Sequence, residues 1–162
     1  MNDTIAYRLA LPEDESALAE LWWAMQSSHH AYDPLWYEDR GEAWCKASWR
    51  EHFRQLLRSE QSVIVVGLCE EQPVGMIVAQ VSARPPIYIK DHMLTIDTTV
   101  VEPRFRRKGL FKGMLAVLEE RARMAGIQVI HLQVHHLNVE AARSYGRSGF
   151  SPETTGMIKW ID

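Results

Sequence analysis

The sequence predicts an α/β protein in which one mixed, mostly antiparallel sheet is flanked by helices. Three observations lead to this prediction. Short β-branched runs and longer segments of helical periodicity follow one another in the order β-α-α-β-β-β-α-β-α-β. A hydrophobic share of 46% in 162 residues is enough to bury a core without disulfides or a metal. No repeat or linker interrupts the pattern, so we expect one domain over residues 1–162.

The first half of the chain is expected to supply a strand, two helices and a hairpin. Residues 5–9 have strand character, and the proline and acidic residues that follow favour a helix over 12–26. The pair Asp33-Pro34 breaks the helical pattern before a second helix over about 38–58. Two apolar runs separated by turn residues predict a hairpin within 62–81. The second helix is expected to turn five side chains inward: Trp44, Trp49, Phe53, Leu56 and Leu57.

The second half is expected to alternate strands with helices. A strand over 93–101 precedes an amphipathic helix over 110–125, which Gly126 is suited to end. A strand over 128–134 follows. Asn138 can cap a helix that reaches about residue 148, and Gly149 can end it. A last strand is expected over 157–161.

Bulk properties exclude several classes of protein. The net charge of -3 does not favour nucleic acid as a partner. The two cysteines show no Cys-x-x-Cys spacing, and there is no signal-peptide pattern or membrane-length apolar run. We therefore expect a soluble cytoplasmic protein with no membrane partner. His131 and His135 would lie roughly 13 Å apart on a strand, too far to share one zinc ion, so no metal is expected.

A basic loop joins the strand at 93–101 to the following helix. Arg104, Arg106, Arg107, Lys108 and Lys112 surround Gly109 there. The start of a helix offers unpaired N–H groups and a positive dipole end, and glycine allows close backbone approach. The pattern suits a phosphorylated cofactor. A solvated surface patch and a nucleic-acid patch are the alternatives.

A second motif follows the strand at 128–134. Asn138, Ala141 and Tyr145 are spaced so that they share one helix face, and Gly149-Phe150 ends the motif. Singly, each residue has a structural explanation as a helix cap, a close-packing residue or a half-buried aromatic.

Together the two motifs resemble the acetyl-coenzyme A (acetyl-CoA) signatures of the GNAT superfamily of N-acetyltransferases. Arg106-x-x-Gly109 matches the first signature, Gln/Arg-x-x-Gly-x-Gly/Ala, although Phe111 stands at its last small position. Phe111 either narrows the approach to the pyrophosphate or faces the core. The resemblance implies that acetyl-CoA is held by Thr99, Val100, Val101, Arg106, Arg107, Lys108, Gly109, Leu110, Phe111, Lys112, Asn138 and Tyr145.

The resemblance also implies direct transfer of an acetyl group to a primary amine, with Tyr145 protonating the departing thiolate. The amine must lose a proton to react, because its reference pKa is about 10.4. Asp97 lies in an otherwise apolar and threonine-rich strand and is the first candidate for this base. His135 or a water molecule is the alternative base, and Asp97 would then be a solvated carboxylate or an electrostatic contact for the amine.

In this family the acceptor pocket is built from the first helices and nearby loops, which implicates Tyr32, Asp33 and Trp36 here. The acceptor is a small molecule or a peptide or protein amine, and the sequence does not identify it. Transfer of another acyl group and a non-catalytic acyl-CoA-binding sensor are the rival functions. Residues 84–88 flank either the acceptor cleft or a partner subunit of a homodimer.

Overall fold

The sheet of the protein consists of five strands that lie side by side in sequence order. The computed structural model, which describes residues 4–161, has the order β1-β2-β3-β4-β5. The strands are β1 (Ile5–Leu9), β2 (Ser62–Cys69), β3 (Gln72–Ala83), β4 (His92–Val101) and β5 (Ile130–Leu132). Strands β1 to β4 pair antiparallel with one another, whereas β5 runs parallel to β4. The predicted mixed, mostly antiparallel sheet is confirmed.

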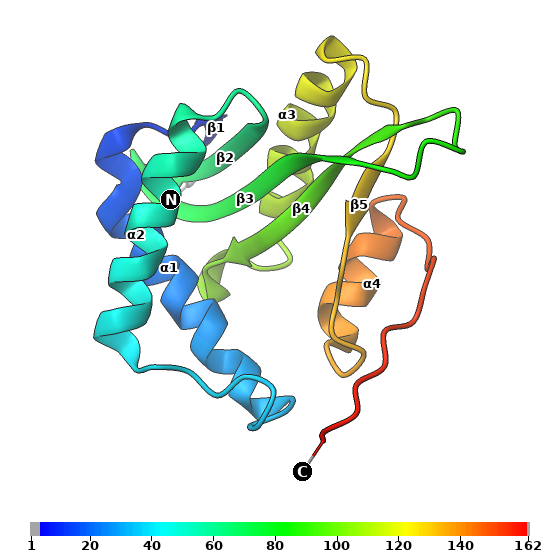
Figure 1. The fold of residues 1–162 in the computed structure, drawn as a ribbon. Helices are drawn as coiled ribbons and strands as arrows, with labels where there is room; N and C mark the ends of the chain where they lie inside the picture. The colour runs from blue at the N-terminus through cyan, green and yellow to red at the C-terminus, as the bar shows by residue number, and fades with distance from the viewer. Residues whose placement is uncertain (1–3, 162) are drawn as a thin grey trace.

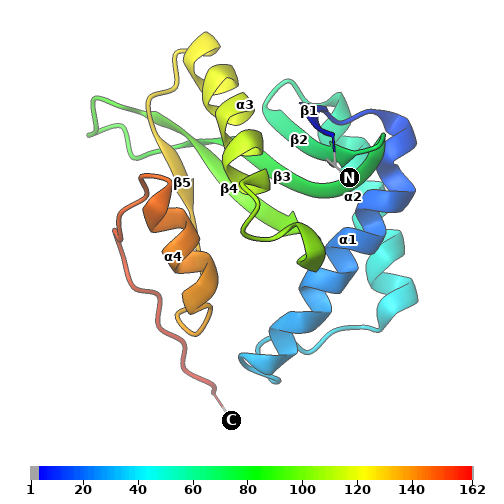
Figure 2. The same cartoon turned by 180° about the vertical axis from the view of Figure 1, so that it is seen from behind.

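Helices cover both faces of this sheet. They are α1 (Glu15–Ser28), α2 (Glu42–Arg58), α3 (Leu110–Met124) and α4 (Val139–Arg147), with short 3-10 turns at Pro12–Asp14, His29–Ala31 and Pro103–Phe105. The pair α1 and α2 packs on one face, α3 packs on the other, and α4 lies next to β5 (Figures 1 and 2). Across the described residues, none of the helices has the length and apolar character needed to cross a membrane.

Each face of the sheet has its own apolar core. The core under α1 and α2 includes Leu18, Trp49, Phe53, Val66, Met76 and Val100. The core under α3 includes Val65, Ile77, Leu94, Ile96, Met114 and Leu118. The neighbours Val65 and Val66 belong to different cores because successive side chains of a strand point to opposite faces. Strand β4 likewise contributes side chains to both cores, Val100 to the one under α1 and α2 and Leu94 and Ile96 to the one under α3.

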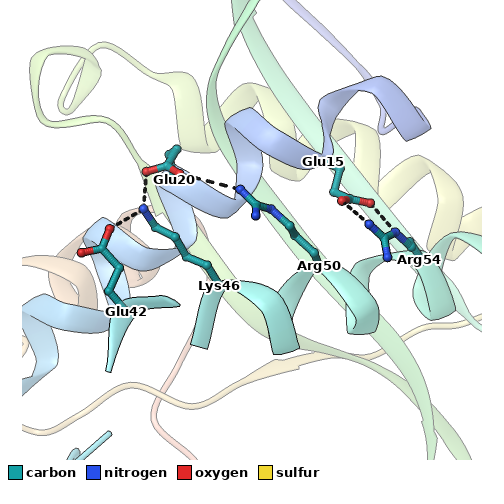
Figure 3. A network of polar contacts seen from close by, with 6 residues as sticks. All are labelled: Glu15, Glu20, Glu42, Lys46, Arg50 and Arg54. Atoms are coloured by element: carbon teal, nitrogen blue, oxygen red, sulfur yellow. Dashed lines mark hydrogen bonds and ion pairs between the residues drawn. The ribbon is translucent and has the colours of Figure 1, made fainter. Parts of the chain in front are cut away.

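Ion pairs join α1 to α2 along their exposed sides (Figure 3). Arg54 donates two hydrogen bonds to Glu15, each 2.7 Å long. Lys46 donates to both Glu20 and Glu42 at 2.5 Å. These contacts are exposed to solvent and screened by salt, so the apolar core beneath them contributes most to the stability of the helix pair.

The second helix starts four residues later than the sequence pattern predicts. Gly41 immediately precedes α2 with a φ of 87°, and Asp39 accepts a hydrogen bond from the Gly41 N–H at 2.7 Å. This left-handed turn interrupts any helix that begins at residue 38. Trp44 was also expected to face the core, but it is 53% exposed in the first turn of α2.

The C-terminal part of the chain departs most from the prediction. The strand expected over 128–134 is limited to the three residues of β5, which pair with Leu94, Thr95 and Ile96 before the two strands part. The strand expected over 157–161 is absent, so this prediction is wrong for the single chain. Residues 151–161 are exposed and have no strand partner within the described part of the chain, and a strand needs a neighbouring edge for its peptide groups.

Candidate active site

The loop after β4 is shaped by one buried aromatic side chain and two left-handed residues. Phe105 ends the Pro103–Phe105 turn and is buried in the core under α3, which anchors the loop. Arg107 and Gly109 then take φ values of 61° and 83°. No atom lies within 4 Å of the position that a Cβ on Gly109 would occupy. Space is therefore open beside the backbone at the start of α3.

The start of α3 presents free backbone donors. No side chain caps Gly109, the N-cap residue, and the Gly113 N–H makes the first helical bond, to the Gly109 carbonyl at 3.0 Å. The N–H groups of Leu110, Phe111 and Lys112 precede that bond and have no helical acceptor. Free N–H groups beside exposed basic side chains are a combination suited to binding an anion.

The basic side chains of the loop have different local partners. Arg106 Nε donates to the Val101 carbonyl at 3.2 Å, which ties the loop back to the end of β4. Arg107 lies 3.6 Å from Glu140 in the first turn of α4 and is largely exposed. Arg107 thus lies between the two sequence motifs and can move toward a phosphate without breaking a buried contact.

The strands β4 and β5 part beside this loop. Their pairing covers only Leu94–Ile96 against Ile130–Leu132, whereas β3 continues to pair with β4 as far as Val101. Within residues 4–161, the edge of β4 from Thr99 to Val101 that faces away from β3 has no strand partner. Its outward peptide groups can therefore bond to an extended ligand as another strand would.

Tyr145 lies where this edge meets α3 and α4. Its ring contacts Phe111 edge-on, with 5.3 Å between centroids, and Phe150 at 5.9 Å. Burial raises the pKa of the Tyr145 phenol above its ordinary value, and the neighbouring Thr99 offsets part of that rise. Thr99 Oγ1 is itself buried and makes no hydrogen bond of ordinary geometry to the described residues. A polar ligand atom at this point would find both hydroxyls close together.

The helix that carries Tyr145 begins as the sequence predicts. Asn138 Oδ1 accepts a hydrogen bond from the Ala141 N–H at 3.2 Å, so Asn138 is the N-cap of α4. Phe111 packs against the core under α3 and against Tyr145. Of the two alternatives for Phe111, contact with the core therefore holds, and its ring also fixes the position of the phenol.

Asp97 lies on the other side of β4, at a bulge. Val78 and Ala79 are consecutive on β3, but their partners on β4 are Thr98 and Ile96, so Asp97 is the extra residue. The bulge turns its carboxylate out of the regular ladder. Gln80 Nε2 donates a hydrogen bond to Asp97 Oδ2 at 2.7 Å.

A cavity of about 350 Å³ adjoins Asp97 on the α1/α2 side. It is lined by Trp22, Trp44, Cys45, Ser48, Trp49, His52, Leu56, Val78, Asp97 and Thr98. The lining combines aromatic rings with one carboxylate, which suits a cation with an apolar body. Sequence reasoning missed this cavity, although the spacing of Trp44, Ser48 and His52 by four residues signals a shared face of α2.

The three acceptor residues suggested by the sequence do not line this cavity. Asp33 instead accepts hydrogen bonds from the N–H groups of Leu35 and Trp36 at 3.1 and 3.0 Å, so its carboxylate holds a turn together. Tyr32 stacks on His135 with 5.0 Å between ring centroids. Trp36 is 54% exposed. Tyr32 thereby connects the loop after α1 to the loop after β5.

His135 makes one hydrogen bond and several ring contacts with neighbouring residues. Its Nδ1 accepts a hydrogen bond from the Leu137 N–H at 3.2 Å, and its ring also lies near Tyr37 and His136. It does not line the cavity beside Asp97. Among residues 4–161, no group of three or more His, Cys, Asp or Glu side chains is placed to hold a metal ion.

Comparison with known proteins gives one family and many similar folds. Residues 17–150 match the sequence model described as the acetyltransferase (GNAT) family. A search of curated proteins found no match.

Three solved structures illustrate the similarity of fold. A mutant of a Bacillus halodurans protein has a TM-score of 0.84 at 16% identity, covering 96% of this chain and 99% of its own. A predicted acetyltransferase from Clostridium acetobutylicum, solved with acetyl-CoA, has a TM-score of 0.75 at 20% identity, covering 98% and 96%. An aminoglycoside 6'-N-acetyltransferase from Acinetobacter baumannii has a TM-score of 0.74 at 13% identity, covering 98% and 100%.

Proposed function

We propose that this chain, which belongs to the acetyltransferase (GNAT) family, transfers an acetyl group from acetyl-CoA directly to a primary amine. The observation that carries the proposal is the arrangement around β4. An uncapped helix start and the Tyr145 phenol lie on one side of this strand, and an aromatic cavity with Asp97 lies on the other. The donor and the acceptor would approach the strand from opposite faces.

The donor would bind by its pyrophosphate at the start of α3. The N–H groups of Leu110, Phe111 and Lys112 would donate to phosphate oxygens, and Arg107 would add positive charge. The pantetheine arm would lie along the open edge of β4 from Thr99 to Val101 and bond to its peptide groups. This path leads from the loop toward the Tyr145 hydroxyl.

The acceptor would occupy the cavity beside Asp97. A protonated amine is attracted to this carboxylate and to the aromatic faces of the lining. An apolar or flat body of modest size would fit a volume of about 350 Å³. We therefore propose a small amine, or the side chain of a peptide lysine, as the acceptor.

Each group then has one role in the transfer. Asp97 takes a proton from the bound ammonium group, directly or through a water molecule, which leaves a neutral amine. The amine nitrogen bonds to the carbonyl carbon as the carbon–sulfur bond breaks, and the sulfur leaves with the electron pair. Tyr145 gives its proton to that sulfur. The acylated nitrogen loses its second proton through solvent to the Tyr145 oxygen, and Asp97 releases its proton to solvent, so the products are a neutral amide, a thiol and one free proton.

The test uses two glycines at opposite ends of α3. Gly109→Val forces a β-branched residue into a left-handed conformation and fills the space where phosphate would lie. Gly126→Val imposes the same backbone cost at a φ of 71° beyond the end of the helix, also with no atom within 4 Å. We expect calorimetric titration to show micromolar binding of acetyl-CoA to the parent and to Gly126→Val, and at least tenfold weaker binding to Gly109→Val.

The same proteins are then assayed for thiol release with a panel of amines. Release that depends on an amine supports the transferase. Binding of acetyl-CoA without release for any amine would favour the rival function, an acyl-CoA sensor. Absence of binding to the parent protein would overturn the proposal for this loop. Competition by longer acyl-CoA thioesters would show whether another acyl group is preferred.

A further inference from the structure

The cavity beside Asp97 contains a single carboxylate. In the described part of the chain, Asp97 is the one acidic side chain of its lining. Gln80 Nε2 donates a hydrogen bond to Asp97 Oδ2 at 2.7 Å, which leaves Oδ1 for a ligand. The other polar lining groups include Ser48, His52 and Thr98, and none of these carries a negative charge. The cavity therefore offers a counter-charge for one ammonium group.

The acidic side chains of the two neighbouring helices are held in ion pairs (Figure 3). The pairs on α1 and α2 are Glu15 and Glu51 with Arg54, Glu20 with Lys46 and Arg50, and Glu42 with Lys46. Each basic partner follows a lining residue, Trp44, Ser48 or His52, by two positions. Two positions along a helix turn a side chain by about 200°, so the basic partners lie across α2 from the cavity. The carboxylates that they bind are not available to a ligand in the cavity.

A guanidinium group lies at the rim of the cavity. Trp44 lines the cavity and is 53% exposed, so it belongs to the opening. Arg40 Cζ lies 4.9 Å from the centroid of the Trp44 ring, in a cation–π contact. This positive charge disfavours a second ammonium group nearby. A polyamine or an aminoglycoside would bring such groups without a carboxylate to receive them.

The inner lining of the cavity includes stacked aromatic rings. Trp22 and Trp49 are stacked with 6.0 Å between ring centroids and 25° between their planes. Phe53 stacks on Trp49 at 5.3 Å. Both Trp49 and Phe53 are buried in the core under α1 and α2, which fixes the position of the stack. A flat ring packs well on such a surface, whereas an aliphatic chain contacts less of it.

We infer that the acceptor is an arylalkylamine, a primary amine with one positive charge that is joined to an aromatic ring by a short link. The inference rests on the proposed function and narrows it, because the ring is assigned to the tryptophan lining and the ammonium group to Asp97. A peptide lysine has an aliphatic chain without a ring, so it would be a weaker acceptor. Polyamines and aminoglycosides carry further charges that the lining does not pair, so they would be poor acceptors.

The first experiment measures the binding of four amines to the parent protein by calorimetric titration without acetyl-CoA. Phenethylamine has an aromatic ring and one amino group. Hexylamine lacks the ring, hexamethylenediamine adds a second amino group to the same chain, and kanamycin represents the aminoglycosides. We expect phenethylamine to bind at least tenfold more tightly than each of the other three.

Two variants test the charge and the ring separately. His52→Glu adds a carboxylate to the lining and should improve the binding of hexamethylenediamine at least tenfold relative to hexylamine. The matched control, His92→Glu, makes the same change at an exposed position of β4 outside the lining, and should leave that ratio unchanged. Trp44→Leu should weaken the binding of phenethylamine at least fivefold. Trp160→Leu should not, because Trp160 is comparably exposed, at 55%, but does not line the cavity. Circular dichroism checks that all four variants are folded.

Turnover separates this inference from the proposed function. The same amines are assayed for thiol release with acetyl-CoA, and kcat/KM should follow the order of the affinities. Preference for the diamine or for kanamycin would overturn the inference and leave the transferase proposal intact. Equal binding of hexylamine and phenethylamine would also overturn it, and so would a diamine affinity that His52→Glu leaves unchanged. Selective binding of phenethylamine without thiol release from any amine would support the ligand class of the cavity and overturn the transferase instead.

Discussion

At the scale of single residues, Tyr145 of α4 links several parts of the candidate site. Its ring contacts Phe111 of α3 and Phe150 beyond α4, and its hydroxyl lies by Thr99 of β4. Burial raises its pKa, so the phenol keeps its proton throughout the neutral range. A protonated hydroxyl held by two aromatic neighbours is suited to donate to a leaving group at a fixed position.

Tyr145→Phe tests this role because it removes only the hydroxyl. We expect kcat for thiol release to fall by about 10²-fold, the lower end of the effect of a general acid. The affinity for acetyl-CoA and the melting temperature should change little, because the contacts of the ring with Phe111 and Phe150 remain. An unchanged kcat in steady-state kinetics would remove Tyr145 from the mechanism.

At the scale of elements, α3 holds its place through a close approach to β1. A Cβ on Gly113 would lie 2.1 Å from the Tyr7 ring, so a larger residue requires that ring to move where the helix passes this strand. The glycine of α4, Gly146, has no atom within 4 Å of the same position. The two helical glycines therefore serve different purposes, although the sequence does not distinguish them.

Alanine substitution at each glycine distinguishes the close contact at Gly113 from the open position at Gly146. Gly146→Ala should raise the free energy of unfolding by up to about 1 kcal/mol, since alanine is the better helix former. Gly113→Ala should lower it by about 1–3 kcal/mol, the usual cost of overpacking, because Tyr7 must move. Urea denaturation of both variants measures the difference. A Gly113→Ala variant as stable as Gly146→Ala would contradict the close packing of α3 on β1.

At the scale of the whole molecule, β4 divides the candidate site in two. Tyr145 and the helix start lie on the α3 side, whereas Asp97 and the cavity lie under α1 and α2. The bulge at Asp97 and the parting of β4 from β5 occur at neighbouring positions of the same strand. A donor and an acceptor that enter from opposite faces would meet there and react without a covalent enzyme intermediate.

Asp97→Asn tests whether Asp97 acts as the base for an amine bound on the α1 and α2 side of β4. We expect kcat/KM for the amine to fall by about 10²-fold at pH 7, with unchanged affinity for acetyl-CoA. The loss should shrink as the pH rises toward the ordinary amine pKa of about 10.4, because the neutral amine then needs no base. The pH profile of kcat/KM measures this recovery.

The matched control for Asp97→Asn is Glu51→Gln, which removes a carboxylate from the outer side of α2, where Glu51 shares a surface hollow with Trp44 and His52. Its kcat/KM should stay close to that of the parent. A loss in Asp97→Asn that does not recover at high pH would instead indicate that Asp97 binds the amine electrostatically.

The sequence by itself predicted the parts of this protein that depend on local patterns. The helix start after β4 and the Asn138 cap of α4 both follow from a few neighbouring residues. The order of the elements up to α4 follows from hydrophobic periodicity in the same way. Local backbone preferences act between residues close in the chain, so they can be inferred without the fold.

Only the tertiary structure decided what depends on contacts between distant segments. The cavity beside Asp97 combines residues from α1, α2, β3 and β4, and Trp44 lines it instead of filling the core. The sequence suggested Asp33 for the acceptor pocket, and the structure adds that its carboxylate accepts two backbone hydrogen bonds within its own loop. Residues 157–161 have the composition of a strand but form none, because a strand exists only where another chain segment completes its hydrogen bonds.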